Sequence, residues 1–242
     1  NTMDLVVTDP PYNVAIENSQ GMTIENDDMD STNFQEFLTA AFENLSDHLK
    51  AGGAFYIWYA NRTHMDFEQS LNNAGLEVRE QLIWNKNSLV PGRQDYQWKH
   101  EPCLYGWKDG ASHYFINNRT LTTVIDDDEL DLDAMKKDEL KALVQRILET
   151  YPDVTVINEK KPAKNDLHPT MKPIKLIARL VKNSSRTREN VLDLFGGSGS
   201  TLIACEQLNR KCFMMEYDPR YADVIIDRWE QQTGEKAVLA NG

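Results

Sequence analysis

Short apolar runs alternate along the chain with longer segments in which apolar residues recur every three to four positions. Apolar, β-branched runs predict strands, and the second spacing predicts amphipathic helices. The predicted strands cover residues 3–8, 54–59, 78–84, 102–107, 190–195 and 212–216, and the predicted helices cover 34–49, 67–74, 174–181, 201–208 and 221–232. Strands that alternate with helices indicate an α/β fold built on a parallel sheet.

The first predicted helix carries its own start and stop signals. Its apolar positions begin at Phe34, so Asn33 is the expected N-cap, and Glu36 follows at the capping-box spacing. The pair Gly52 and Gly53 lies beyond its end and breaks the pattern.

Two segments interrupt the alternation. Residues 85–113 are rich in aromatic and polar residues, and outside the strand at 102–107 they are expected to form functional loops. Residues 126–153 hold ten acidic and four basic residues, and their apolar positions share one helical face. We expect this acidic segment to be an inserted helical element outside the sheet.

The composition is that of a globular domain: 242 residues, 40% hydrophobic and 26% charged. No apolar run is long enough to span a bilayer, and the first residues lack the pattern of a secretion signal. Cys103, Cys205 and Cys212 form no C-x-x-C pair, which disfavours both a disulfide framework and structural zinc. A cytoplasmic protein without a metal is therefore expected.

The net charge of −12 argues at first against a nucleic-acid partner. Residues 158–188, however, hold nine basic and two acidic residues, a local net charge of +7. Such a stretch either contacts a phosphate backbone or is a solvated surface. Lys172 and Lys175 within it can equally cap or solvate the neighbouring helix.

A glycine-rich motif, V-L-D-L-F-G-G-S-G-S-T, runs from Val191 to Thr201 between a predicted strand and a predicted helix. Glycine lets the backbone approach a ligand closely, and a helix N-terminus presents free N–H groups to it. Glu216 ends the next strand 19 residues after Gly197, the spacing at which an acid accepts hydrogen bonds from ribose hydroxyls. An adenosine-containing cofactor is indicated, although such a loop can also be a structural turn.

The kind of cofactor follows from the residues around these glycines. A dinucleotide fingerprint requires a third glycine where the chain has Leu202, and a P-loop requires a lysine that is absent. The spacing D-x-F-x-G-x-G, from Asp193 to Gly199, instead resembles the S-adenosylmethionine loop of Rossmann-like methyltransferases.

A second motif, Asp9-Pro10-Pro11-Tyr12, follows the first predicted strand. The exocyclic amino group of adenine is a poor nucleophile, because its lone pair is delocalised into the ring. A carboxylate and a backbone carbonyl that accept its hydrogens would favour an attackable form, and an aromatic ring can stack a flipped base. The tetrapeptide alone is equally compatible with a turn that buries a tyrosine.

The order of the motifs resembles that of β-class DNA amino-methyltransferases. D-P-P-Y comes first, H-P-T-M-K-P follows from His168 to Pro173, and the glycine-rich loop comes last. The segments G-G-A-F-Y-I-W, L-I-W-N-K-N, W-K-H-E-P-C-L-Y-G-W-K and M-E-Y-D-P-R-Y are also similar to the family, closest to site-specific adenine methyltransferases of phages and prophages. The resemblance implies a Rossmann-like S-adenosylmethionine-dependent methyltransferase sheet with helices on both faces and a circularly permuted motif order. It divides the chain into a catalytic half (1–107), an inserted target-recognition segment (108–164) and a cofactor-binding half (165–242).

The resemblance also implies a reaction, methyl transfer from S-adenosylmethionine to the N6 amino group of adenine in duplex DNA. The implied catalytic residues are Asp9, Pro10, Pro11 and Tyr12. The implied cofactor-binding residues are His168, Thr170, Asp193, Phe195, Gly196, Gly197, Ser198, Gly199 and Glu216. Family members that act on cytosine N4 more often carry serine in place of Asp9, so adenine is favoured and cytosine N4 is the alternative.

Double-stranded DNA is the expected partner, in the cytoplasm of a bacterial or phage-infected cell and associated with the nucleoid. Basic residues interleaved with aromatic ones offer phosphate contacts and stacking groups. The expected DNA contacts are Lys86, Arg93, Lys99, Lys108 and Arg119.

Other functions are weighed against this one. RNA methyltransferases that act on guanine N2 also carry D-P-P-Y but usually place the glycine-rich loop first, and Leu202 disfavours a nicotinamide oxidoreductase. A non-catalytic DNA-binding or regulatory module on the same scaffold stays open, because the family usually has a further strand and a cofactor-binding acid before D-P-P-Y. The chain starts at Asn1, so we expect a fragment whose upstream part could hold another domain, and a homodimer is compatible with the resemblance.

Overall fold

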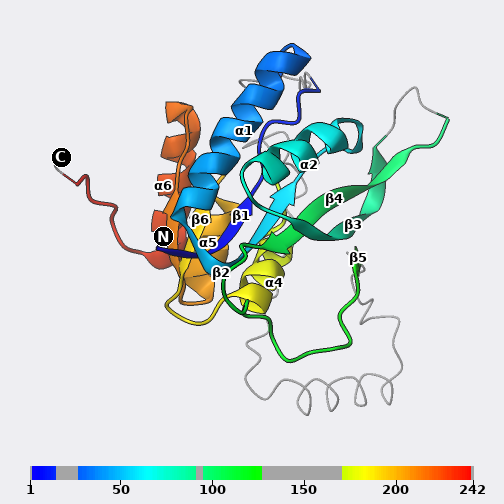
Figure 1. Cartoon of the computed structure of the whole chain (residues 1–242). Helices are drawn as coiled ribbons and strands as arrows, with labels where there is room; N and C mark the ends of the chain where they lie inside the picture. Colours follow the sequence, from blue (N-terminus) through cyan, green and yellow to red (C-terminus); the bar gives the residue numbers. More distant parts are fainter. Residues whose placement is uncertain (1, 15–26, 91–94, 127–170, 241–242) are drawn as a thin grey trace, which may run out of the picture.

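A seven-stranded sheet organises the computed structural model, which describes residues 2–14, 27–90, 95–126 and 171–240 (Figure 1). The strands are β1 (Met3–Thr8), β2 (Leu49–Trp58), β3 (Val78–Val90), β4 (Trp98–Trp107), β5 (Val124–Asp126), β6 (Asn190–Asp193) and β7 (Lys211–Met214). The helices are α1 (Ser31–His48), the short 3-10 helix η1 (Asn61–Thr63), α2 (His64–Asn73), α4 (Ile174–Ser184), α5 (Ser200–Gln207) and α6 (Pro219–Thr233). The strands on both sides of residues 127–170 belong to the same sheet.

The sheet is mixed, whereas the alternation of strands and helices predicted a parallel one. Its order is β5-β3-β4-β2-β1-β6-β7, and β1 pairs in parallel with both β2 and β6. β4 runs antiparallel to β2 and to β3. The reason lies in the connection from β3 to β4, which is too short to hold a crossover helix and instead forms a hairpin.

Each face of the sheet has its own apolar core. Successive side chains of a strand point to opposite faces, and in β1 Leu5 and Val7 belong to one buried cluster while Val6 belongs to the other. Met3 also belongs to the second cluster, since the pairing of β1 with β2 is irregular between Met3 and Leu5. The first cluster contains residues of α4 and α5, and the second contains residues of α1 and α2 (Figure 1). Helices therefore cover both faces, as the family resemblance implied.

The start of α1 differs from its prediction. The N-cap is Asp30, whose carboxylate accepts hydrogen bonds from the backbone N–H groups of Thr32 and Asn33. Asn33, the predicted cap, lies inside the first turn. The apolar pattern begins later than the helix because the first turn, Ser31 to Asn33, faces solvent.

The loops predicted at 85–113 are partly strand. β3 continues to Val90 and β4 begins at Trp98, and the pairing of Asn85 with His100 joins these extensions. β5 was not predicted, since three residues give too short a pattern to detect.

Some predictions fall outside the described residues, namely the acidic helical segment beyond residue 126, the part of the basic stretch up to residue 170, Arg93, His168 and Thr170. Within the described part of the chain, the helices are all too short or too polar to cross a membrane.

Candidate active site

The two predicted motifs meet at one edge of the sheet. β1 ends at Thr8, directly before Asp9, and β6 ends at Asp193, directly before the glycine-rich loop. Because β1 and β6 are parallel neighbours, their carboxyl ends lie side by side. The Thr8 hydroxyl donates to Asp193 Oδ1 at 2.8 Å, across 185 positions of sequence, and accepts from the Leu194 N–H at 3.2 Å.

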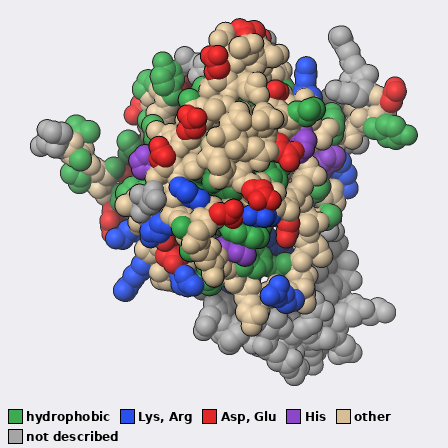
Figure 2. Space-filling model, viewed as in Figure 1, with side chains coloured by type: hydrophobic (Ala, Val, Ile, Leu, Met, Phe, Trp, Pro, Cys, Tyr) green, Lys and Arg blue, Asp and Glu red, His purple; other side chains and the backbone are tan. Residues whose placement is uncertain are grey.

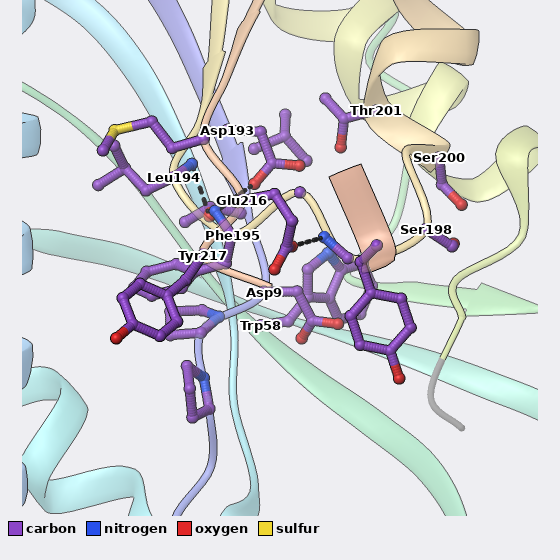
Figure 3. Close-up of a pocket in the computed structure, with 18 of the residues that line it drawn as sticks. Asp9, Trp58, Asp193, Leu194, Phe195, Ser198, Ser200, Thr201, Glu216 and Tyr217 are labelled. Carbon is purple, nitrogen blue, oxygen red and sulfur yellow. Dashed lines mark hydrogen bonds between the residues drawn. The ribbon is translucent and has the colours of Figure 1, made fainter. Parts of the chain in front are cut away.

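A cavity of about 640 Å³ opens at this edge. Its lining includes Asp9, Tyr12 and Trp58 together with the glycine-rich loop and Glu216. Figure 3 shows Asp9 and Trp58 close to Glu216 and to the loop residues Phe195 and Ser198. Residues of α1, among them Phe37 and Asn44, and the exposed Tyr217 also line it. The cavity thus has room for a small molecule beside the D-P-P-Y residues.

The glycine-rich loop turns sharply at the cavity. Gly199 adopts a φ of 82° and precedes the first residue of α5, and a Cβ on Gly196 would lie 2.8 Å from the Met214 side chain. Glu216 Oε2 accepts the Gly197 N–H at 2.6 Å, and Oε1 accepts the Asp218 N–H at 2.9 Å. Since each carboxylate oxygen has two lone pairs, Glu216 is held in place and keeps acceptor capacity for a ligand.

Asp193 is a buried carboxyl group beneath this loop. Burial raises its pKa to about 7, although hydrogen bonds from Thr201, Thr8 and the Phe195 N–H favour the ionised form. Asp193 therefore joins β1, β6 and α5 through its oxygens.

The D-P-P-Y turn is fixed by hydrogen bonds to its backbone and its side chains. The buried Asp27 carboxylate accepts the Tyr12 N–H at 2.9 Å, and the Tyr12 hydroxyl donates to Asp9 Oδ1. Burial and the nearby carboxylates of Asp9 and Glu101 raise the pKa of Tyr12, so its hydroxyl keeps the proton that it donates. Asp9 itself is 27% exposed and faces the cavity.

A buried lysine lies directly beside Asp9. Lys172 is 5% exposed, and its Nζ lies 2.6 Å from Asp9 Oδ2 and 3.0 Å from Glu101 Oε2. The sequence interpretation, a lysine that contacts DNA or solvates a helix, is wrong for Lys172. Lysine is exposed in most proteins, so the sequence pattern carried no sign of this burial.

Glu101 continues the line of charges onto β4. Its second ion pair is with Lys86 of β3. Burial raises the pKa of Glu101, but Lys172 and Lys86 more than offset that effect, so the pKa lies below its usual value and the group is ionised. Alternating charges thus run from Lys86 through Glu101 and Lys172 to Asp9.

The chain also matches the sequence model of a known protein family. The model of a family described as DNA methylase, which covers N6 and N4 enzymes, matches residues 3–227. The chain belongs to the DNA methylase family.

Curated relatives of this DNA methylase include Type II methyltransferases. It is 26% identical over 246 residues to the Type II methyltransferase M2.DpnII of Streptococcus pneumoniae, covering 96% of this chain and 84% of that protein. It is likewise 26% identical over 240 residues to the Type II methyltransferase M.HpaI of Haemophilus parainfluenzae, covering 96% and 69%.

Solved structures share its fold. A structure of M1.HpyAVI with S-adenosylmethionine superposes with a TM-score of 0.64 at 18% identity, covering 94% of this chain and 89% of that chain. The cytosine-N4-specific PvuII DNA methyltransferase gives a TM-score of 0.67 at 16% identity, covering 96% and 84%. The Rossmann-like methyltransferase fold of this DNA methylase is thereby shown.

The predicted DNA-contact residues of this DNA methylase do not form one group. Lys99 is exposed on β4, and Arg119 is exposed in the loop between β4 and β5. The Lys108 Nζ donates to the Ser46 carbonyl at 2.5 Å, at the opposite edge of the sheet from Asp9, and its contact with DNA stays a prediction. Basic and acidic side chains are interspersed on the face shown in Figure 2. Among those of these residues that the structure describes, only Lys86 joins the charges beside Asp9.

Proposed function

We propose that this DNA methylase transfers a methyl group from S-adenosylmethionine to the N6 amino group of adenine in double-stranded DNA. The observation that carries the proposal is that Asp9 and the glycine-rich loop with Glu216 line the same cavity. A base held by Asp9 and a cofactor held by the loop would then lie next to each other.

The residues around the loop fit S-adenosylmethionine. Glu216 keeps free lone pairs at the cavity wall, where ribose hydroxyls can donate to them. Phe37 and Phe195 pack with ring centroids 5.9 Å apart and supply an apolar wall. When bound, this cofactor supplies a methyl group activated by a sulfonium.

The role proposed for Asp9 follows from its hydrogen bonds. Each of its oxygens accepts one bond from the protein, from Tyr12 at Oδ1 and from Lys172 at Oδ2, so lone pairs remain for an amino hydrogen. A hydrogen bond to the carboxylate draws electron density back to the amino nitrogen, and the Pro10 carbonyl is the proposed second acceptor. The bonds to Asp9 are preorganised, so catalysis rests on positioning and electrostatics.

Cytosine N4 is the second candidate, since the structural likeness includes a cytosine-N4-specific enzyme. Cytosine presents the same kind of delocalised amino group, so Asp9 and the cavity can serve either base. Adenine is preferred here because the first catalytic position is aspartate.

The deciding experiment is transfer of a labelled methyl group to unmethylated duplex DNA, followed by nucleoside digestion and mass spectrometry. We expect labelled N6-methyladenine. Labelled N4-methylcytosine would support the same mechanism of methyl transfer, with cytosine instead of adenine as the target base. The absence of any labelled nucleoside, tested also on the longest natural form of the protein, would favour the non-catalytic module.

A further inference from the structure

The ammonium of Lys172 has three polar partners. Its Nζ donates hydrogen bonds to Asp9 Oδ2 at 2.6 Å and to the Tyr12 hydroxyl at 3.1 Å, and it forms an ion pair with Glu101 Oε2 at 3.0 Å. The group also lies 5.2 Å from the centre of the Trp58 ring. The Lys172 ammonium is therefore directed at Asp9, Tyr12 and Glu101.

The surroundings keep this buried group charged. Burial alone lowers the pKa of a lysine, but Asp9 and Glu101 raise that of Lys172 above its usual value. Glu101 is in turn paired with Lys86, so the four side chains carry two positive and two negative charges. An isolated buried ammonium would be strongly unfavourable, and this arrangement compensates it.

The main chain of Lys172 is also fixed. Its carbonyl accepts the Ser200 hydroxyl at 2.9 Å, and Ser200 is the first residue of α5, directly after the glycine-rich loop. The ammonium therefore approaches Asp9 from a segment tied to the cofactor side of the cavity.

We propose that Lys172 is a positioning residue for methyl transfer, which orients the Asp9 carboxylate toward the target amino group while Glu101 and Lys86 hold Lys172. The proposal rests on the proposed function. Tyr12 holds one oxygen of Asp9 and Lys172 holds the other, so the carboxylate cannot rotate without breaking a charged hydrogen bond. The remaining lone pairs of Asp9 Oδ1 and Oδ2 then stay oriented toward the target amino group.

The kinetic consequence is specific. Lys172 lines the cavity, but its ammonium is bound to Asp9, Tyr12 and Glu101. Its loss should therefore impair the transition state and leave ground-state binding nearly unchanged. A small misplacement of a catalytic group costs about 100-fold in rate. We therefore expect the Lys172→Met variant to have a strongly lowered kcat, with KM for DNA and Kd for S-adenosylmethionine close to those of the wild type.

The test compares Lys172→Met with the double variant Lys172→Met/Glu101→Gln and with Lys211→Met, an exposed lysine at the start of β7. For each protein, kcat, KM, the calorimetric Kd for S-adenosylmethionine and Tm are measured. The double variant removes one charge of each sign, so we expect it to recover the Tm lost by Lys172→Met while kcat stays low by about 100-fold. Lys211→Met should match the wild type in all four quantities.

Three results would overturn the role of Lys172. They are a kcat of Lys172→Met within threefold of the wild type, a kcat that recovers together with Tm in the double variant, and a Kd for S-adenosylmethionine that rises as much as kcat falls. The second would show a purely structural ion pair. A wild-type protein that methylates no DNA would instead refute the proposed function, and the role of Lys172 with it.

Discussion

At the scale of single residues, carboxyl groups with different environments divide the work of the site. Asp9 is partly exposed and hydrogen-bonded to a lysine and a tyrosine, whereas Asp193 is buried among the ends of β1, β6 and α5. Both residues are aspartates, so the difference comes from their neighbours: Asp9 is suited to bind a substrate, and Asp193 is suited to stabilise the fold.

Asp193 predicts a distinctive dependence of stability on pH. Its pKa is raised to about 7 in the folded protein, so between about pH 4 and pH 7 the folded state keeps a proton that the unfolded state has lost. Unfolding then releases a proton, and stability falls as the pH rises through this window. The replacement Asp193→Asn removes the ionisable group, and its amide can keep partners in Thr8 and Thr201.

The measurement is the free energy of unfolding in urea for both proteins from pH 4 to pH 8. We expect the wild type to lose stability relative to Asp193→Asn by at most about 1.4 kcal/mol per pH unit, and the difference to level off above pH 7. A difference that is constant across this range would contradict the raised pKa.

Glu216 predicts a change in cofactor affinity. Loss of its carboxylate in Glu216→Ala should weaken S-adenosylmethionine binding by about 1–3 kcal/mol, the range for hydrogen bonds to a charged group. Glu216→Gln keeps one oxygen acceptor, so its affinity for S-adenosylmethionine should lie between those of the wild type and Glu216→Ala. Calorimetric titration measures both, and equal affinities for the alanine variant and the wild type would remove Glu216 from the proposed cofactor site.

The site could be predicted from the sequence only where a motif is local. Asp9, Tyr12, Gly197 and Glu216 stand in short patterns with a chemical reason for their spacing, and the structure places them around one cavity. Lys172 stands in the H-P-T-M-K-P segment of the family resemblance, but that segment gives no chemical reason to expect its burial beside Asp9. Its burial arises because the D-P-P-Y turn after β1, the strand β4 and the segment before α4 converge. Only the folded sheet brings these three segments together.

At the scale of elements, the start of α1 is set by its N-cap residue rather than by the spacing of its apolar residues. The first helix begins where Asp30 caps the N–H groups of Thr32 and Asn33, and hydrogen bonds from Asn33 and Thr32 lower the pKa of Asp30. The apolar positions alone placed this start too late. The strand predicted at 3–8 has the observed bounds, and the strand predicted at 190–195 ends two residues earlier, at Asp193; in both cases proline or glycine follows the apolar run. The β3–β4 hairpin was missed because its polar tip hides the alternation.

The cap yields a comparison of two variants. We expect Asp30→Ala to lower Tm more than Asn33→Ala, because only Asp30 satisfies two free N–H groups of the helix. The destabilisation should diminish as the pH falls through the lowered pKa of Asp30, where its carboxylate becomes protonated and the wild type loses the same contribution. Equal Tm values for the two variants would contradict the assignment of the cap.

At the scale of the whole molecule, the sheet explains why motifs from opposite ends of the sequence form one site. β1 lies between β2 and β6, so the first strand of the chain contacts the strand that carries the glycine-rich loop (Figure 1). The parallel direction of β1 and β6 puts D-P-P-Y and D-x-F-x-G-x-G at the same edge. The circularly permuted motif order therefore still brings both motifs to the carboxyl ends of neighbouring parallel strands, where ligands bind in doubly wound folds.

We propose that Asp9 acts on the target base in the cavity that would also hold the cofactor. The most direct measurement is the single-turnover rate of methyl transfer to duplex DNA at saturating S-adenosylmethionine by the wild type, by Asp9→Ala and by Asp47→Ala, a control at an exposed aspartate near the end of α1. We predict that Asp9→Ala is slower by about 100- to 1,000-fold, as expected for a lost preorganised electrostatic contact, with an unchanged Kd for S-adenosylmethionine, and that Asp47→Ala matches the wild type. An Asp9→Ala variant that transfers methyl groups at the wild-type rate would contradict the account.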